Sequence, residues 1–97
     1  MCKSQIFAEI INLVAQEMEV PSEKILSDDK TMETVDARYL IVRLLLEEGL
    51  YPAQIASKIR KTNRYVNYIK TNMDARFQQG KMLRILFERI RKERGNN

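Results

Sequence analysis

Polar and cationic side chains gather on one side of residues 51–73, which read YPAQIASKIRKTNRYVNYIKTNM. With 100° between successive residues, a helix that begins at Asn63 separates these side chains from apolar ones. The apolar side holds Val66, Ile69, Met73 and Phe77. The opposite side, which we call the outward row, holds Asn63, Arg64, Asn67, Tyr68 and Thr71, with Asn72 beside it. Arginine can donate two hydrogen bonds to guanine, and asparagine can pair with adenine, so the row predicts base contacts in duplex DNA.

Basic and amide side chains surround the outward row and could contact phosphates, which supply most of the affinity for DNA. The predicted phosphate contacts are Gln54, Lys58, Arg60, Lys61 and Lys70. Gln54 stands near the start of a helix, where backbone N–H groups also attract a phosphate. The pattern is only moderately specific, because most helical proteins present a polar helix face to water.

Two helices with a short break between them must position these side chains. Pro52 suits the first position of a helix that runs to Ile59, with Ile55, Ala56 and Ile59 turned inward. Residues 60–62 form a tight break, Thr62 caps the next helix, and that helix runs from Asn63 to Phe77. This spacing is typical of a helix-turn-helix, in which a small Ala56 lets the two helices cross closely. Tyr65 is expected near the core and Tyr68 outside.

The rest of the chain predicts more helices and no strands. Apolar residues at three- and four-residue steps indicate helices over Ser4–Met18, Val35–Glu48 and Lys81–Arg94, and a single helical turn over Ser22–Leu26. The expected caps are Ser4 for the first helix and Thr34 or Asp36 for the second, with a loop over 27–34 and Gly49 as a stop signal. The last helix should close the core with Met82, Leu83, Ile85, Leu86 and Ile90, and Met32 and Met73 are likewise expected in a loop or the core. We therefore expect one all-α domain over residues 1–97, a bundle of five to six helices.

Composition excludes several chemistries. The 97 residues include no His and one Cys, so a histidine base, an internal disulfide and Cys- or His-rich metal sites are excluded. No cofactor motif is present, and the carboxylates suit caps and solvated surface, so we expect no cofactor and no enzymatic activity. No apolar run is long enough to span a bilayer and no signal peptide is recognisable, so we expect a cytoplasmic protein without membrane contact.

Charge is distributed unevenly along the chain. Residues 1–57 hold 5 Lys/Arg and 10 Asp/Glu, whereas residues 58–97 hold 12 and 3, so the net charges of −5 and +9 sum to +4. A basic half joined to an acidic half would orient the molecule toward a polyanion.

The order of these motifs resembles the C-terminal DNA-binding domain of the bacterial replication initiator DnaA. The resemblance runs from IINLVAQEMEVPSEKILS at 10–27, through VDAR at 35–38 and LYPAQIA at 50–56, to the closing helix. It implies a six-helix, Trp-repressor-like fold in which the helix from Asn63 recognises short duplex sites, supported by the loop before Val35. The family signature Gly-Arg-Asp-His-Thr-Thr-Val is replaced by KTNRYV at 61–66, and the preceding loop is acidic (Asp28, Asp29, Glu33). Base specificity should therefore differ from that of the family.

The sequence thus predicts sequence-specific binding to double-stranded DNA by a stand-alone DnaA-like domain, acting as a transcription regulator or an accessory replication factor. The alternative is a protein–protein interaction module that has lost DNA binding. RNA binding is less favoured, because exposed aromatic stacking platforms are lacking. No small-molecule substrate is evident, and a homodimer or a partner protein remains open.

Overall fold

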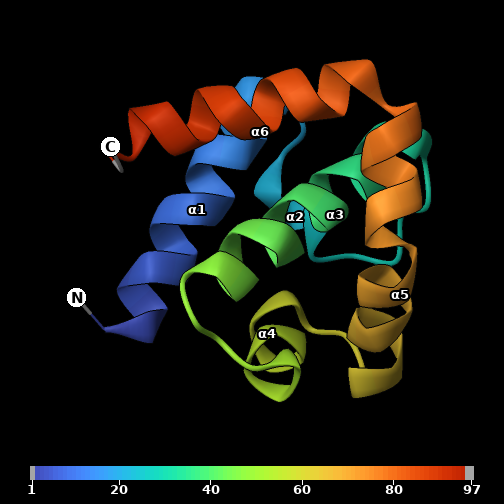
Figure 1. The fold of residues 1–97 in the computed structure, drawn as a ribbon. Coiled ribbons are helices and arrows are strands. Elements are labelled where there is room, and N and C mark those ends of the chain that lie inside the picture. The colour runs from blue at the N-terminus through green and yellow to red at the C-terminus, as the bar shows by residue number, and fades with distance from the viewer. Residues whose placement is uncertain (1, 96–97) are drawn as a thin grey trace.

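Six helices and no strands follow one another along residues 2–95, the part of the chain described by the computed structural model (Figure 1). They are α1 (Lys3–Met18), α2 (Ser22–Ile25), α3 (Met32–Glu47), α4 (Pro52–Ile59), α5 (Asn63–Gln79) and α6 (Lys81–Glu93). The all-α class and the order of the elements are as the sequence predicts. In Figure 1, α6 lies at one end of the molecule, α4 lies at the opposite end, and α5 runs between them.

α3 occupies the centre and contacts each of the other five helices. Its apolar face is broad because residues at nearly every angle around the helix are hydrophobic, and Leu40, Ile41 and Leu45 are completely buried. The remaining helices each contribute one apolar stripe, so a single continuous core fills the molecule.

α3 begins earlier than the sequence indicated, at Met32 with Thr31 as its cap, and not at Val35 with Thr34 or Asp36 as cap. The Asp29 carboxylate accepts a hydrogen bond from the Thr31 N–H (3.1 Å) and contacts the Thr31 hydroxyl, which also lies 2.9 Å from the Thr34 hydroxyl. These side-chain bonds fix the backbone before the helix and add almost a turn to it. Thr34 is therefore a buried residue inside α3.

α6 buries fewer of its apolar residues than expected. Leu83, Leu86, Phe87 and Ile90 recur at helical spacing and are buried, and Phe87 packs edge-on against Phe77 of α5 with 5.7 Å between ring centroids. Met82 and Ile85 fall on the other side of the helix and are 65% and 41% exposed. The expectation that these two residues close the core is wrong, because only one stripe of α6 faces the bundle.

The predicted helix boundaries near Gly49 and Pro52 are confirmed. Gly49 has φ 92, a left-handed conformation that suits a residue without Cβ, and Pro52 is the first residue of α4. α1 begins at Lys3, so Ser4 lies inside its first turn and is not the cap. None of the helices in residues 2–95 is long and apolar enough to cross a membrane.

Candidate nucleic-acid interface

α4 and α5 are joined by residues 60–62, as the sequence predicts. Arg60 ends α4 in a left-handed conformation with φ 61, and the Lys61 N–H donates to the Ala56 carbonyl over 2.9 Å. The Thr62 hydroxyl then accepts a hydrogen bond from the Tyr65 N–H (3.1 Å), which confirms Thr62 as the cap of α5. Ala56 is 2% exposed, so its small side chain lies within the core beneath this turn.

The outward row lies on the surface of α5. Asn63, Arg64, Asn67, Tyr68 and Thr71 are all exposed, with Tyr68 at 62%. Val66, Ile69, Met73 and Phe77 on the opposite side are buried, as expected. Two of the polar side chains are already engaged with the helix itself: the Thr71 hydroxyl donates to the Asn67 carbonyl (2.9 Å) and the Asn72 amide donates to the Tyr68 carbonyl (2.8 Å). The row therefore offers Arg64 and two free-standing asparagine side chains to an approaching ligand.

The residues predicted to contact phosphates differ in whether their side chains already have partners within the protein. Arg60 and Lys70 are exposed and form no ion pair within residues 2–95. The Lys58 ammonium donates to the Ser4 hydroxyl (2.8 Å), and the Gln54 side-chain oxygen accepts from the Tyr51 N–H (2.8 Å) at the start of α4. Gln54 and Lys58 lie on α4 with Lys3 of α1 in one hollow, Arg60 ends α4, and Lys70 lies near the middle of α5.

Lys61 is held against the protein surface. Its side chain is 12% exposed, its ammonium donates to the Ser27 carbonyl, and the Asp28 carboxylate lies 3.8 Å away. Burial lowers the pKa of Lys61 from its ordinary value, and the nearby Arg38 charge lowers it further. Its positive charge already serves the loop between α2 and α3, so Lys61 is less available to a phosphate than Arg60 or Lys70.

A buried arginine that the sequence analysis did not single out fixes the position of α5. Arg38 of α3 is 1% exposed; its Nε donates to the Ile25 carbonyl (2.8 Å) and its Nη2 to the Ser27 carbonyl (2.7 Å). Its Nη1 lies 3.3 Å from the Tyr65 hydroxyl of α5. Arg38 thus ties the loop after α2 to the first turn of α5. Arg38 is three residues before Ile41 and seven before Leu45, so it lies on the buried stripe of α3. A cation at a position of this apolar stripe is the feature of the sequence that could have identified Arg38 as a buried residue.

Ion pairs engage several of the basic residues of α6 and of the end of α5. Arg89 pairs with Glu17 (3.1 Å), and Arg76 pairs with Asp36 (2.8 Å). Further pairs are Arg91 with Glu47 and Glu88, and Arg94 with Glu9 and Glu48. The acidic first half of the chain therefore cancels much of the positive charge of the second half. Arg60, Arg64 and Lys70 form no ion pair within residues 2–95, and neither do Lys81, Arg84 and Lys92 of α6.

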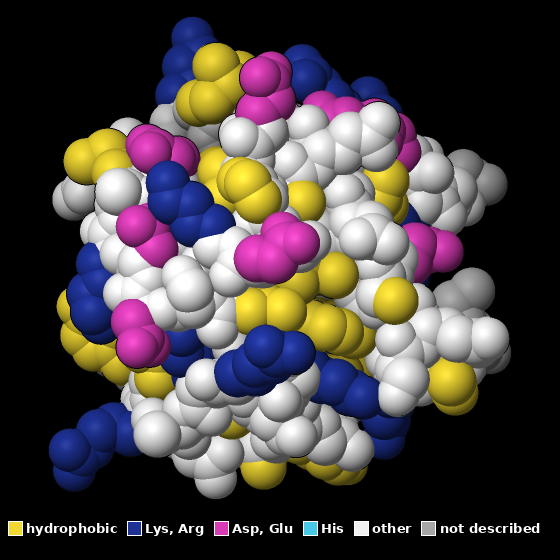
Figure 2. Space-filling model, turned by 180° about the vertical axis from the view of Figure 1, so that it is seen from behind, with side chains coloured by type: hydrophobic (Ala, Val, Ile, Leu, Met, Phe, Trp, Pro, Cys, Tyr) yellow, Lys and Arg dark blue, Asp and Glu magenta, His cyan; other side chains and the backbone are white. Residues whose placement is uncertain are grey.

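The surface view agrees with this distribution of charge. In Figure 2, Lys and Arg side chains are interspersed with Asp and Glu over most of the visible face. The lowest part of that view, where α4 and the start of α5 lie, shows Lys and Arg but no Asp or Glu.

The acidic residues before α3 serve the fold. Hydrogen bonds from Thr31 and Thr34 lower the pKa of Asp29 to about 2, so this carboxylate is ionised at neutral pH and holds the start of α3. Asp28 faces Lys61, while Glu33 lies exposed in the first turn of α3. Lys30 is the one basic residue between α2 and α3, and it follows directly after these two aspartates.

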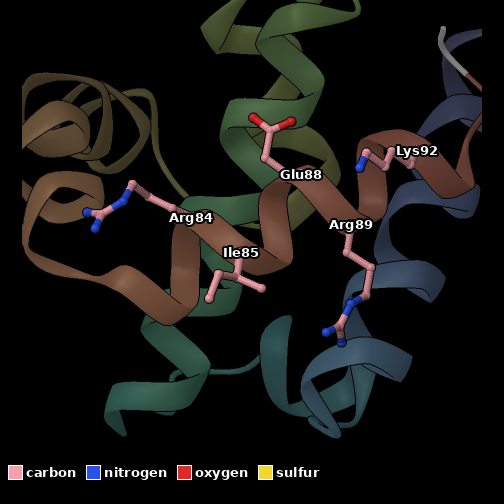
Figure 3. A pocket seen from close by; sticks show the side chains of 5 residues that line it. All are labelled: Arg84, Ile85, Glu88, Arg89 and Lys92. Carbon is pink, nitrogen blue, oxygen red and sulfur yellow. The ribbon is translucent and has the colours of Figure 1, made fainter.

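A hollow along α6 is lined by side chains of a single helix. It has a volume of about 480 Å³ and is lined by Arg84, Ile85, Glu88, Arg89 and Lys92. Figure 3 shows that these side chains come from one helix and spread in different directions, so they do not converge on a ligand. Within residues 2–95, no three Cys, His, Asp or Glu residues are grouped so that they could hold a metal ion.

Comparison of this chain with protein-family models, with curated proteins and with solved structures gives no match.

Proposed function

We propose that this protein binds double-stranded DNA, with α5 in the major groove and the outward row against the base edges. An α-helix fits the major groove of B-form DNA when one of its faces is polar, exposed and free of acidic groups. Before Asp74, the exposed side of α5 meets these requirements. The observation that carries the proposal is this exposed row of Arg and Asn side chains, flanked by cations without carboxylate partners.

Phosphate binding supports the same orientation. Arg60 at the end of α4 precedes the outward row along the chain, whereas Lys70 follows Tyr68 within its span, and both are exposed. Cations already paired with carboxylates must break those pairs before they bind phosphates, whereas unpaired ones release only counterions from the DNA. Arg60, Arg64 and Lys70 should therefore bind phosphates more readily than the paired Arg89, Arg91 and Arg94.

We further propose that the protein acts as a transcription regulator or an accessory replication factor, as its resemblance to the DnaA C-terminal domain implies. The changed signature at residues 61–66 favours a target sequence different from that of the family. Arg64 would contact guanine, and Asn63 and Asn67 would contact adenine or its neighbours.

Selection of bound sequences from random DNA duplexes, at physiological salt, tests this function directly. We expect enrichment of a short motif, and we expect Arg64→Ala to lose preference at one position of it. Arg91→Ala removes the same charge from α6 and should leave the motif intact. Recovery of no motif, together with no salt-dependent affinity for any duplex, would contradict the proposal.

One observation favours the alternative of a protein-interaction module. Met32 and Met82 are 73% and 65% exposed, and together with Met18 and Leu86 they line a hollow of about 470 Å³ between α1, α3 and α6. Exposed apolar groups of this kind can bind a partner protein. Salt distinguishes the two functions, because DNA binding weakens steeply with ionic strength while an apolar interface changes little.

A further inference from the structure

A small cavity lies between the start of α3 and α5, behind the outward row. Its volume is about 160 Å³, and its lining is mostly apolar. The lining residues are Lys30, Val35, Tyr39, Tyr65, Tyr68 and Ile69. They come from two segments that are distant in the sequence, so the cavity exists only in the folded protein.

The size of the cavity suits one six-membered ring. An apolar cavity of about 150 Å³ engineered into another protein stays dry and binds benzene. The cavity described here has nearly the same volume, so a single ring fits it while a fused two-ring system would be crowded.

Two of the three tyrosine walls, Tyr39 and Tyr65, are held in place before any ligand arrives. The Tyr65 hydroxyl is bonded to the buried Arg38 (3.3 Å), and the Arg76 guanidinium lies 4.7 Å from the centre of the Tyr39 ring. Tyr39 is 2% exposed, whereas Tyr68 is 62% exposed and can move. A preorganised wall lowers the entropy cost of binding, and the aromatic rings favour offset or edge-on contact with another ring.

Charge decides which ring-bearing ligand fits. Pockets walled by several aromatic residues often bind organic cations. Here the only charged lining residue is Lys30, and the Arg38 and Arg76 guanidinium groups contact the tyrosine walls. Two carboxylates next to lining residues in the chain are already committed, since Asp36 pairs with Arg76 and Asp29 is bonded to Thr31. The surroundings therefore repel a cation and attract an anion.

We propose that this cavity binds a small anionic aromatic molecule with a single ring, the ring lying among Tyr39, Tyr65 and Tyr68 and the acid group facing Lys30. Benzoate is the simplest probe of this class. The proposal does not depend on DNA binding, because it is measured without DNA, although Tyr68 belongs both to the outward row and to the cavity.

The experiment uses the full chain carrying Tyr51→Phe. The chain has 4 Tyr and no Trp, and Tyr51 is exposed and outside the cavity, so the three remaining tyrosines are all reporters of the site. We expect benzoate to shift the NMR signals of these three rings, with a dissociation constant on the order of 1 mM, as is usual for so small a ligand. Benzylammonium should bind at least about tenfold more weakly because of Lys30, and cyclohexanecarboxylate several-fold more weakly because it lacks an aromatic ring.

Two variants locate the site. Val35→Phe fills the cavity and should weaken benzoate binding by about tenfold or more, while Ala8→Phe adds the same ring to the exposed side of α1 and should change nothing. Lys30→Gln alters only an exposed side chain and should weaken benzoate binding several-fold without unfolding the protein, so it decides the matter if Val35→Phe fails to fold. Unshifted tyrosine signals at about 20 mM benzoate, benzylammonium binding as tight as that of benzoate, or unchanged affinity in Lys30→Gln would each overturn the proposal.

Discussion

α5 and α6 are both amphipathic helices rich in basic residues, but they differ in how many of their cations pair with carboxylates of other helices. Arg89 and Arg91 of α6, and Arg94 directly after it, pair with carboxylates of α1 or α3. Lys81 and Lys92 of α6 have no such partner within the described chain. On the first two turns of α5, Arg64 and Lys70 are exposed and have no such partner within the described chain. The difference teaches that the net charge of a segment is a weak guide to function. A cation is available to an anionic ligand only when no carboxylate of the folded protein already pairs with it.

The largest effect should come from breaking the anchor behind α5. Arg38→Met leaves the Ile25 and Ser27 carbonyls without their buried donor, which should lower the free energy of unfolding by about 2–4 kcal/mol. Arg94→Met is the counterpart at the end of α6. It should cost less than about 1 kcal/mol, because Glu9 and Glu48 remain partly exposed and can be hydrated. Urea denaturation of both variants measures the contrast, and equal losses would contradict it.

The comparison of Arg64→Ala with Arg91→Ala tests function at the two helices. If Arg64 bonds guanine, its loss should weaken binding to the selected duplex by about 1–3 kcal/mol and bring it close to the affinity for unrelated duplexes. Arg91 is held between Glu47 and Glu88, so its loss should have a much smaller effect on DNA binding. Fluorescence anisotropy with labelled duplexes gives both values. Equal effects of the two variants would show attraction by overall charge alone.

Salt dependence can separate a free lysine from an occupied one. Lys70→Ala should reduce the slope of log affinity against log salt concentration by about 0.9, the contribution of one phosphate contact. Lys61→Ala should reduce it less, because the Lys61 ammonium already bonds the Ser27 carbonyl. Titrations of one duplex at several salt concentrations decide the order, and a larger change for Lys61 would show that its bond to the loop is released on binding.

A left-handed residue at the end of α4 allows stability and binding to be changed in opposite directions. Arg60→Gly relieves the cost of φ 61 and should stabilise the fold by roughly 0.5–1 kcal/mol, while removing a predicted phosphate contact. Glu19 has φ 56 at the end of α1 and provides the matched control: Glu19→Gly should stabilise similarly without weakening DNA binding. Thermal unfolding and anisotropy test the two effects. Unchanged DNA affinity in Arg60→Gly would remove Arg60 from the interface.

The smallest effect concerns the loop that anchors α3. The pKa of Asp29 is about 2 in the folded protein, below its ordinary value of 3.8. The carboxylate therefore contributes stability above pH 4 that is lost as the pH falls through 2. Asp29→Asn should flatten the fall of stability in this window, as measured by denaturation at stepwise pH, and Asp74→Asn controls for the loss of one negative charge. If Asp29→Asn leaves the dependence of the free energy of unfolding on pH unchanged, other groups cause the loss of stability in acid.

Periodicity in the sequence was enough to predict the helices and the exposure of the outward row. Each helix boundary outside α3 falls within about two residues of the expectation, because Pro52, Thr62 and Gly80 mark the ends locally. The start of α3 was missed because it depends on bonds among the Asp29, Thr31 and Thr34 side chains, which propensities do not describe.

The tertiary contacts of the site could not be predicted in the same way. The pairing of Arg94 with Glu9 joins residues 85 positions apart, so the sequence shows both charges but not their cancellation. The cavity likewise unites Lys30 and Tyr39 with Tyr68 only after the chain has folded.

The anchoring of α5 by Arg38 has a consequence for how this protein could change over time. Because α5 is positioned from its inner side, side chains on its outer side contribute little to holding the helix in place. Substitutions there should cost little stability, so new binding preferences could be acquired one residue at a time without passing through unfolded intermediates.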